Sequence, residues 1–275
     1  MRKGFTLIEM SFVLVIVGMI IVMVFPALKA IHKSTQYTAT QTNLSTLMRA
    51  AAAFTHAHGC LPCPTPAAPS TYVTPSSGFG HVRGDSSGTM CGTCSTAEGI
   101  PPFMSMGLPA ATAKDGYGRW ITMSIDPKLA ENSGTLPPTA PCTASDGSSC
   151  LLDHSQKGLC AAGLDKSKAP QVRIHSSSNT EPKEFALIFL SHGENGYGAF
   201  RIDSSPTNNM HNYNGPASSC SLHSGFEICN TDNDRVFVDA EHKNTKKDPF
   251  DDILYYLDRN ALIALLGNHV CETTW

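Results

Sequence analysis

The chain has 275 residues, a net charge of −3 and 41% hydrophobic residues, enough for one sizeable domain or two small ones. No basic run is longer than two residues, so the charge distribution gives no support to nucleic-acid binding. Charged residues make up only 16% of the chain, which suggests a loop-rich, largely β domain, and ten cysteines favour an oxidising compartment.

A long apolar stretch opens the chain. It runs from Phe5 to Phe25, 21 residues of which Glu9 is the one charged residue. As a helix it would span roughly 30 Å, the thickness of a bilayer's hydrocarbon core. Arg2 and Lys3 precede it, and because basic residues stay on the cytoplasmic side, the rest of the chain is expected outside the cytoplasm.

Two ordinary explanations compete for this stretch. A secretory signal would need a small-residue cleavage site after its apolar core, and residues 26–29 supply only a weak one. A plain membrane anchor gives no reason for Glu9, because a carboxylate near the bilayer interior costs on the order of 3 kcal/mol and marks function by default.

The leader Gly4-Phe5-Thr6-Leu7-Ile8-Glu9 resembles the class III signal of type IV prepilins and type II secretion pseudopilins. In that family a prepilin peptidase cuts after the glycine and methylates the new N-terminal residue. The resemblance implies a cut between Gly4 and Phe5, methylation of Phe5, and Glu9 as the fifth mature residue. In a helix, Glu9 would lie one turn from the Phe5 ammonium. If the Glu9 carboxylate of one subunit paired with the Phe5 ammonium of a neighbouring subunit, the desolvation penalties of both charges would be removed.

The resemblance also implies partners and a location. The expected partners are prepilin peptidase, other pilin or pseudopilin subunits and the inner membrane. We expect a single-pass inner-membrane protein with its head in the periplasm, which moves into a periplasmic or extracellular filament after assembly.

The helical pattern continues past the apolar stretch. Apolar residues recur at spacings of three and four, and they are Leu28, Ile31, Leu44, Leu47, Met48, Ala51 and Ala52. Gly59 is expected to end the helix at His58, about 80 Å from its start at Phe5. Gly18 and Pro26 are expected to interrupt or kink it. In pilin-like proteins this segment can melt on assembly, and a harmless kink is the alternative.

The remainder predicts a loop-rich head. The strand candidates are residues 120–125, 171–175, 185–190, 236–238 and 253–257. The main loops are 133–147 and 207–221, and a short amphipathic helix is expected at 259–266 before Gly267. The predicted fold is α+β and pilin-like, with the long N-terminal helix packed on an antiparallel β-sheet. The expected organisation is a leader at 1–4, a transmembrane and assembly helix at 5–25, an amphipathic second half at 26–58, and a disulfide-rich head at 59–275.

Several head segments are similar to those of a subset of prepilin-type proteins. They are Cys60 to Pro64, Gly99 to Pro109, Asp115 to Arg119, Ser191 to Gly196, and Asp251 to Ile253. None is an established catalytic motif, so we expect these segments to serve folding.

The cysteines allow two kinds of site. Cys60-x-x-Cys63 and Cys91-x-x-Cys94 have the spacing of a four-thiolate zinc site, but an oxidising location favours disulfides, either within or across the two pairs. The candidate disulfide cysteines are Cys60, Cys63, Cys91, Cys94, Cys142, Cys150, Cys160, Cys220, Cys229 and Cys271.

Acidic residues near the C-terminus are the other metal candidates. Major pseudopilins bind calcium in a C-terminal loop, and Asp248, Asp251 and Asp252 could supply oxygen ligands here, as could Asp232 and Asp234. A solvated acidic turn is the alternative, and no other cofactor is predicted. The histidines are scattered and no HExxH or GxSxG motif occurs, so no catalytic residue and no enzyme activity are predicted.

The predicted function is that of a structural subunit of a type IV pilus or type II secretion filament. The mature chain would have 275 − 4 = 271 residues, large beside a typical major pilin, which favours a minor pilin or minor pseudopilin. The alternative is a membrane-tethered adhesion or ligand-binding protein with a cysteine-rich extracytoplasmic head.

Overall fold

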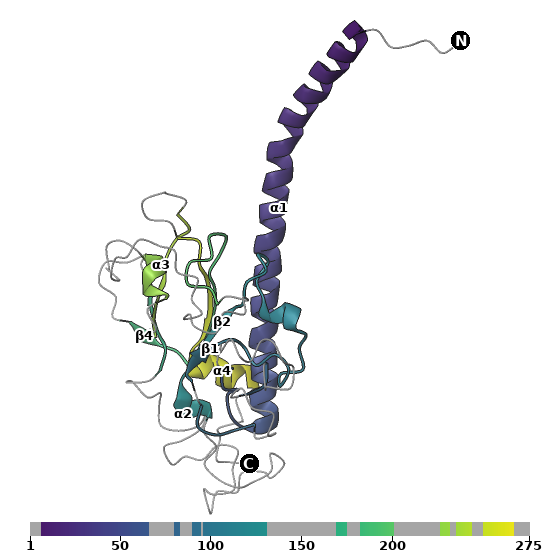
Figure 1. Cartoon of the computed structure of the whole chain (residues 1–275). Coiled ribbons are helices and arrows are strands. Elements are labelled where there is room, and N and C mark those ends of the chain that lie inside the picture. The colour runs from purple at the N-terminus through teal and green to yellow at the C-terminus, as the bar shows by residue number, and fades with distance from the viewer. Residues whose placement is uncertain are drawn as a thin grey trace, which may run out of the picture.

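A long helix projects from a β-rich head in the computed structural model (Figure 1). The structure describes residues 7–65, 80–82, 90–94, 96–130, 169–174, 182–200, 226–231, 235–243 and 250–266. Helix α1 spans Leu7–His58, and 52 residues at 1.5 Å each give about 78 Å. As predicted, the helix ends at Gly59, which has a φ of 75°, a backbone conformation that glycine adopts readily. The Gly59 N–H donates a hydrogen bond to the Thr55 carbonyl at 2.8 Å.

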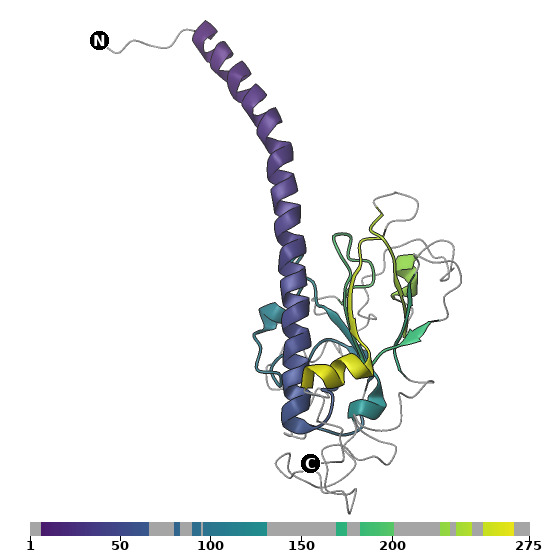
Figure 2. The same ribbon diagram turned by 180° about the vertical axis from the view of Figure 1, so that it is seen from behind.

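The two halves of α1 have different surroundings. Leu28 and Ile31 are exposed, and the buried face begins only at Thr40. The predicted apolar face from Leu44 to Ala52 is buried against the head. The head therefore covers only the C-terminal part of the helix, while the N-terminal part stands clear of it and curves (Figures 1 and 2).

A four-stranded antiparallel sheet forms the centre of the head. Its strand order is β1-β2-β5-β7, with the bounds Glu98–Gly99, Thr122–Ile125, Leu187–Ser191 and Ile253–Leu257. Met123 of β2 pairs with Phe189 of β5, which pairs with Tyr255 of β7. This sheet confirms the predicted α+β architecture.

A second, smaller sheet was not predicted. It contains β4 (Lys183–Glu184), β3 (Gln171–Ile174) and β6 (Val236–Asp239), in the order β4-β3-β6. The β3–β6 pair is parallel, so the expectation of a single antiparallel sheet was incomplete. Parallel pairing needs a long connection between its strands, and sequence periodicity alone does not reveal it.

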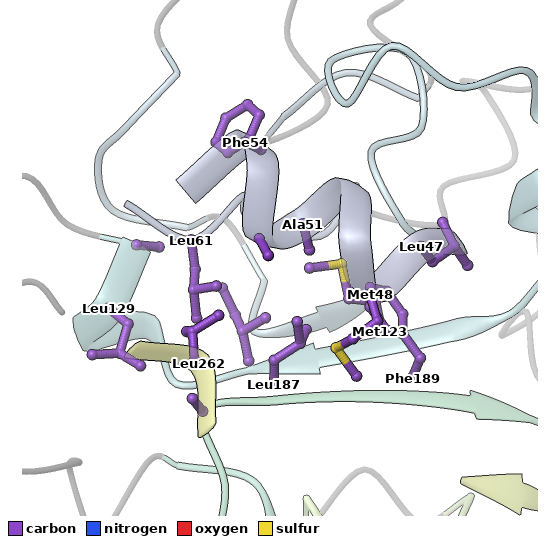
Figure 3. Close-up of a cluster of buried hydrophobic side chains, with 14 of the residues drawn as sticks. Leu47, Met48, Ala51, Phe54, Leu61, Met123, Leu129, Leu187, Phe189 and Leu262 are labelled. Atoms are coloured by element: carbon purple, nitrogen blue, oxygen red, sulfur yellow. The ribbon is translucent and has the colours of Figure 1, made fainter. Parts of the chain in front are cut away.

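The main sheet is buried on both faces, which explains the unbroken apolar run in β5. Leu187 and Phe189 pack in the cluster that contains α1, whereas Ile188 and Leu190 pack in the cluster that contains β3 and β6. Alternate side chains of a strand point to opposite faces, so the layers are helix, main sheet and small sheet. Figure 3 shows the first interface, with Leu47 and Met48 of α1 above Met123 and Phe189.

Short helices complete the described part. They are η4 (Ala110–Ala113), α2 (Pro127–Ala130), α3 (Phe226–Cys229) and α4 (Arg259–Leu266). Helix α4 has the predicted bounds and lies against the C-terminal end of α1 (Figure 2), where Leu262 joins the core. The other three have a single turn each, too short for a helical period to show in the sequence. The predicted loops 133–147 and 207–221 lie outside the described residues.

Candidate assembly helix and head sites

The N-terminal half of α1 presents a continuous apolar surface. From Leu7 to Phe25 its large apolar side chains are 45–92% exposed. Its most apolar window has a mean hydropathy of 2.8, and none of that window is buried. Among the described residues, α1 is the one helix long and apolar enough to cross a membrane. A surface this large calls for a cover of lipid or of other protein chains.

Glu9 lies within this apolar surface. It occupies the first turn of α1, its side chain is exposed, and no other charged residue occurs from Leu7 to Phe25. Gly4 and Phe5, the predicted cleavage and methylation residues, lie outside the described residues. Whatever apolar medium covers the helix will therefore also surround the Glu9 carboxylate, which is unfavourable unless a positive charge meets it.

Gly18 and Pro26, the predicted kink positions, both lie inside α1. The helix is continuous through both of them, and no atom lies within 4 Å of where a Cβ of Gly18 would be. Proline removes one main-chain hydrogen bond from a helix interior. The helix therefore curves over this half without ending (Figure 1).

The head contacts the backbone of α1 closely at Gly116. A Cβ at this position would lie 2.0 Å from the Gln36 carbonyl oxygen, so only glycine fits. The Gly116 N–H donates to Thr40 Oγ1 at 2.9 Å, and Asn43 Nδ2 donates to the Lys114 carbonyl at 2.7 Å. These contacts fix the head at the point where α1 enters it.

Asp115 organises the turn that carries Gly116. Its Oδ1 accepts from the N–H groups of Tyr117 and Arg119 at 3.0 and 2.9 Å, and its Oδ2 accepts from Ser191 Oγ at 2.8 Å. Burial raises the pKa of this carboxyl, and these hydrogen bonds oppose the shift. The 115–119 and 191–196 segments are thus neighbours in space, and the Arg119 guanidinium donates to the carbonyls of Gly193 and Glu194.

An acidic cluster lies beside the same loop. Glu227 of α3, Asp251 and Asp252 each offer a carboxylate oxygen within 4.8 Å of the others. Burial, and to a lesser extent contact with Asp251, raises the pKa of Glu227 to about 7, and burial followed by the charge of Glu227 raises that of Asp252 well above its usual value. Of the predicted calcium ligands, Asp251 and Asp252 are in the cluster, while Asp248, Asp232 and Asp234 lie outside the described residues.

Two disulfides join the segment after α1 to residues 90–94. They connect Cys60 to Cys91 and Cys63 to Cys94, so the bonds run across the two pairs. With all four sulfurs bonded in this way, none is a thiolate, and the four-thiolate zinc alternative does not fit. Cys229 is also disulfide-bonded. The remaining candidates, Cys142, Cys150, Cys160, Cys220 and Cys271, lie outside the described residues.

Comparison with known protein families finds a match at the start of the chain. Residues 1–25 match the family described as the prokaryotic N-terminal methylation motif. The chain therefore carries the signature of type IV pilins and pseudopilins. No curated protein and no solved structure matches it.

The pilin signature indicates what the exposed apolar half of α1 is for. The motif implies processing by prepilin peptidase and assembly with other pilin subunits, and it indicates a structural subunit. The motif ends at Phe25, and the apolar surface of α1 lies within its bounds. The described part of the match, Leu7 to Phe25, thus lies within the stretch of α1 that the head leaves uncovered.

Glu227 is the functional candidate that the sequence did not reveal. It belongs to a single helical turn, and 24 residues separate it from Asp251. The nearest signal was the pair Asp251-Asp252 with Asn195 in the 191–196 segment, but only the fold brings the three segments together.

Proposed function

We propose that this chain is a minor subunit of a type IV pilus or type II secretion filament, and that it assembles through residues 5–25. The observation that carries the proposal is the methylation motif on a helix whose apolar half is wholly uncovered by the head. In the inner membrane, lipid covers this surface. In a filament, the same half-helices of neighbouring subunits cover it.

Glu9 gives the assembly its register. After cleavage behind Gly4, the new Phe5 terminus carries an ammonium, and Glu9 lies four residues further along the chain, the spacing of one helical turn. In an apolar filament core each charge is unfavourable alone, and the ammonium of one subunit beside the Glu9 carboxylate of another offsets both. The pairing holds in only one axial position, so it selects how an incoming subunit docks.

The experiment compares Glu9→Val and Glu9→Gln with a matched control, Ser11→Ala. Ser11 is exposed two residues further along α1 and donates a hydrogen bond to the Ile8 carbonyl, so its substitution removes a polar group without removing a charge. We expect all three variants to be cleaved and to reach the membrane fraction. We expect both Glu9 variants to be lost from sheared filaments and Ser11→Ala to be retained there.

Retention of processed Glu9→Val in filaments would refute an assembly role for the carboxylate. That outcome would favour the alternative, a membrane-tethered binding protein whose helix is only an anchor.

The minor role rests on the size of the chain. The mature protein would keep 271 of 275 residues, and its described head already contains two sheets behind the second half of α1. Quantitative mass spectrometry of purified filaments tests this part separately. We expect far fewer copies of this chain than of the main subunit, and a dominant band would refute the minor role.

Orientation follows from Arg2 and Lys3 before the apolar stretch. We infer a cytoplasmic N-terminus and a periplasmic head. A C-terminal alkaline phosphatase fusion, which is active only outside the cytoplasm, is expected to be active. An inactive fusion in intact membranes would contradict this orientation.

A further inference from the structure

A short cationic face follows the apolar stretch of α1. It consists of Lys29, His32 and Lys33, which are all exposed. Spacings of three and four residues place these side chains on one side of the helix. Phe25 lies on the same side, because the Lys29 Nζ is 5.6 Å from the centre of its ring. The cationic face is therefore a direct continuation of the apolar surface along α1.

The cationic face lies at a defined height beyond the apolar stretch. Because α1 is continuous through Pro26, a rise of 1.5 Å per residue puts Lys29 about 6 Å and Lys33 about 12 Å beyond Phe25 along the helix axis. The headgroup layer on each side of a hydrocarbon core is about 5–7 Å thick. Long lysine side chains direct their ammonium groups toward such a layer. If lipid covers α1 up to Phe25, both lysines are within reach of lipid phosphates.

The head neutralises one of the two lysines. Lys33 Nζ lies 2.8 Å from Glu194 Oε2, and both side chains are about half exposed, at 54% and 52%. Lys29 meets the ring of Phe25 and has no carboxylate partner in the part of the chain that the structure describes. An exposed ammonium that is held beside the apolar stretch is thus left for an anion from outside the chain.

We propose that the cationic face binds the phosphate headgroups of anionic phospholipids, in the leaflet on the head's side of the membrane. An ammonium group has three hydrogen-bond donors for phosphate oxygens, and an anionic membrane surface favours a nearby lysine by about fivefold in binding. The face continues from the surface that lipid covers, so the headgroups of those lipids are the nearest anions to it. The proposal rests on the proposed function in one respect, because α1 must span a membrane.

Headgroup binding would set the height and orientation of the head above the membrane. Phosphate would hold Lys29 while Glu194 holds Lys33, so the cationic face would connect the headgroups to the 191–196 segment. That segment is joined to the turn that contacts α1, because the Arg119 guanidinium donates to the carbonyls of Gly193 and Glu194. A subunit that leaves the membrane for a filament would have to give up these headgroups.

The test measures which lipid the full chain retains in detergent. Equal amounts of phosphatidylglycerol, which is anionic, and phosphatidylcholine, which has no net charge, are added, and native mass spectrometry compares the two adducts. We expect the wild-type chain to retain phosphatidylglycerol in preference. Lys29→Gln is expected to lower the ratio of the two adducts about fivefold, and Lys29→Arg to keep it. Glu194→Gln is expected to raise the ratio, because it releases Lys33 from its ion pair.

Arg49→Gln is the matched control. Arg49 is an exposed cation on the same helix, about 36 Å beyond Phe25 and out of reach of the headgroups, so this variant is expected to keep the wild-type ratio. Arg2 and Lys3 are present in every variant and cannot account for a difference between variants.

Flotation with phosphatidylcholine vesicles separates this proposal from the proposed function. A wild-type chain that fails to float would overturn the membrane-spanning helix and, with it, the headgroup site. A chain that floats but retains both lipids equally would overturn the headgroup site alone.

Two further results would also overturn the proposal. An unaltered ratio in the double variant Lys29→Gln with Lys33→Gln would place the anionic lipid elsewhere, next to Arg2 and Lys3. Equal losses in Lys29→Gln and Arg49→Gln would show an effect of net charge and not of position.

Discussion

Leu47→Ala measures how firmly the head depends on the second half of α1. Leu47 is 0% exposed in the core between α1 and the main sheet, near Phe189 (Figure 3). A Leu→Ala change at such a site loses the transfer free energy of the side chain and leaves a cavity, about 3 kcal/mol in total. For a unit of this size, each kcal/mol lowers Tm by roughly 2–4 °C, so we expect a drop of about 6–12 °C.

The matched control is Leu28→Ala on the same helix. Leu28 is 57% exposed, so the substitution should change head stability by less than about 0.5 kcal/mol. Both variants are compared by near-UV circular dichroism and tryptophan fluorescence of the full chain in detergent, where the buried Trp120 reports on the head. Equal shifts in Tm, or no shift for Leu47→Ala, would refute the division of α1 into an uncovered half and a docked half.

Three further predictions concern how the head is held together. Gly116→Ala should lower the Tm by several degrees because its Cβ would lie 2.0 Å from a carbonyl oxygen of α1, whereas Gly18→Ala, with open space around it, should leave head stability unchanged. Removing the Cys60–Cys91 disulfide by a double serine substitution should lower the free energy of unfolding in urea by about 2 kcal/mol, less than a lone bridge of this separation would contribute, because Cys63–Cys94 still closes almost the same loop. Asp115→Ala leaves three donors without their acceptor and should reduce the Tm far more than Asp115→Asn, which keeps one acceptor oxygen; equal losses would contradict this account.

Local sequence signals were sufficient for the long helix and for the strands of the core. The spacing of apolar residues from Leu44 to Ala52 predicted the buried face of α1, and Gly59 predicted its end. Strands β2, β3, β5, β6 and β7 all fall on predicted segments. The two-residue strands β1 and β4 were missed because two residues cannot show an alternating pattern. The apolar run of β5 indicated burial, but not that two different layers bury it.

Some of the candidate functional residues could likewise be found from the sequence, and others only from the fold. The methylation motif is contiguous, so the sequence alone pointed to Gly4, Phe5 and Glu9. The acidic cluster depends on side chains from two segments that are far apart in the chain, so only the fold could bring Glu227 to Asp252. The pairing of the cysteines across the two C-x-x-C pairs was equally out of reach, because both connectivities satisfy the spacing.

The most direct measurement is the mass of the mature N-terminus, taken from the protein isolated from cells with its native processing machinery. We expect an N-terminal peptide that begins at Phe5 and carries one added methyl group on its amine. Such a terminus provides the ammonium that Glu9 requires in a neighbouring subunit. A mature chain that still begins with Met1 to Gly4 would contradict the account, because that ammonium would never form.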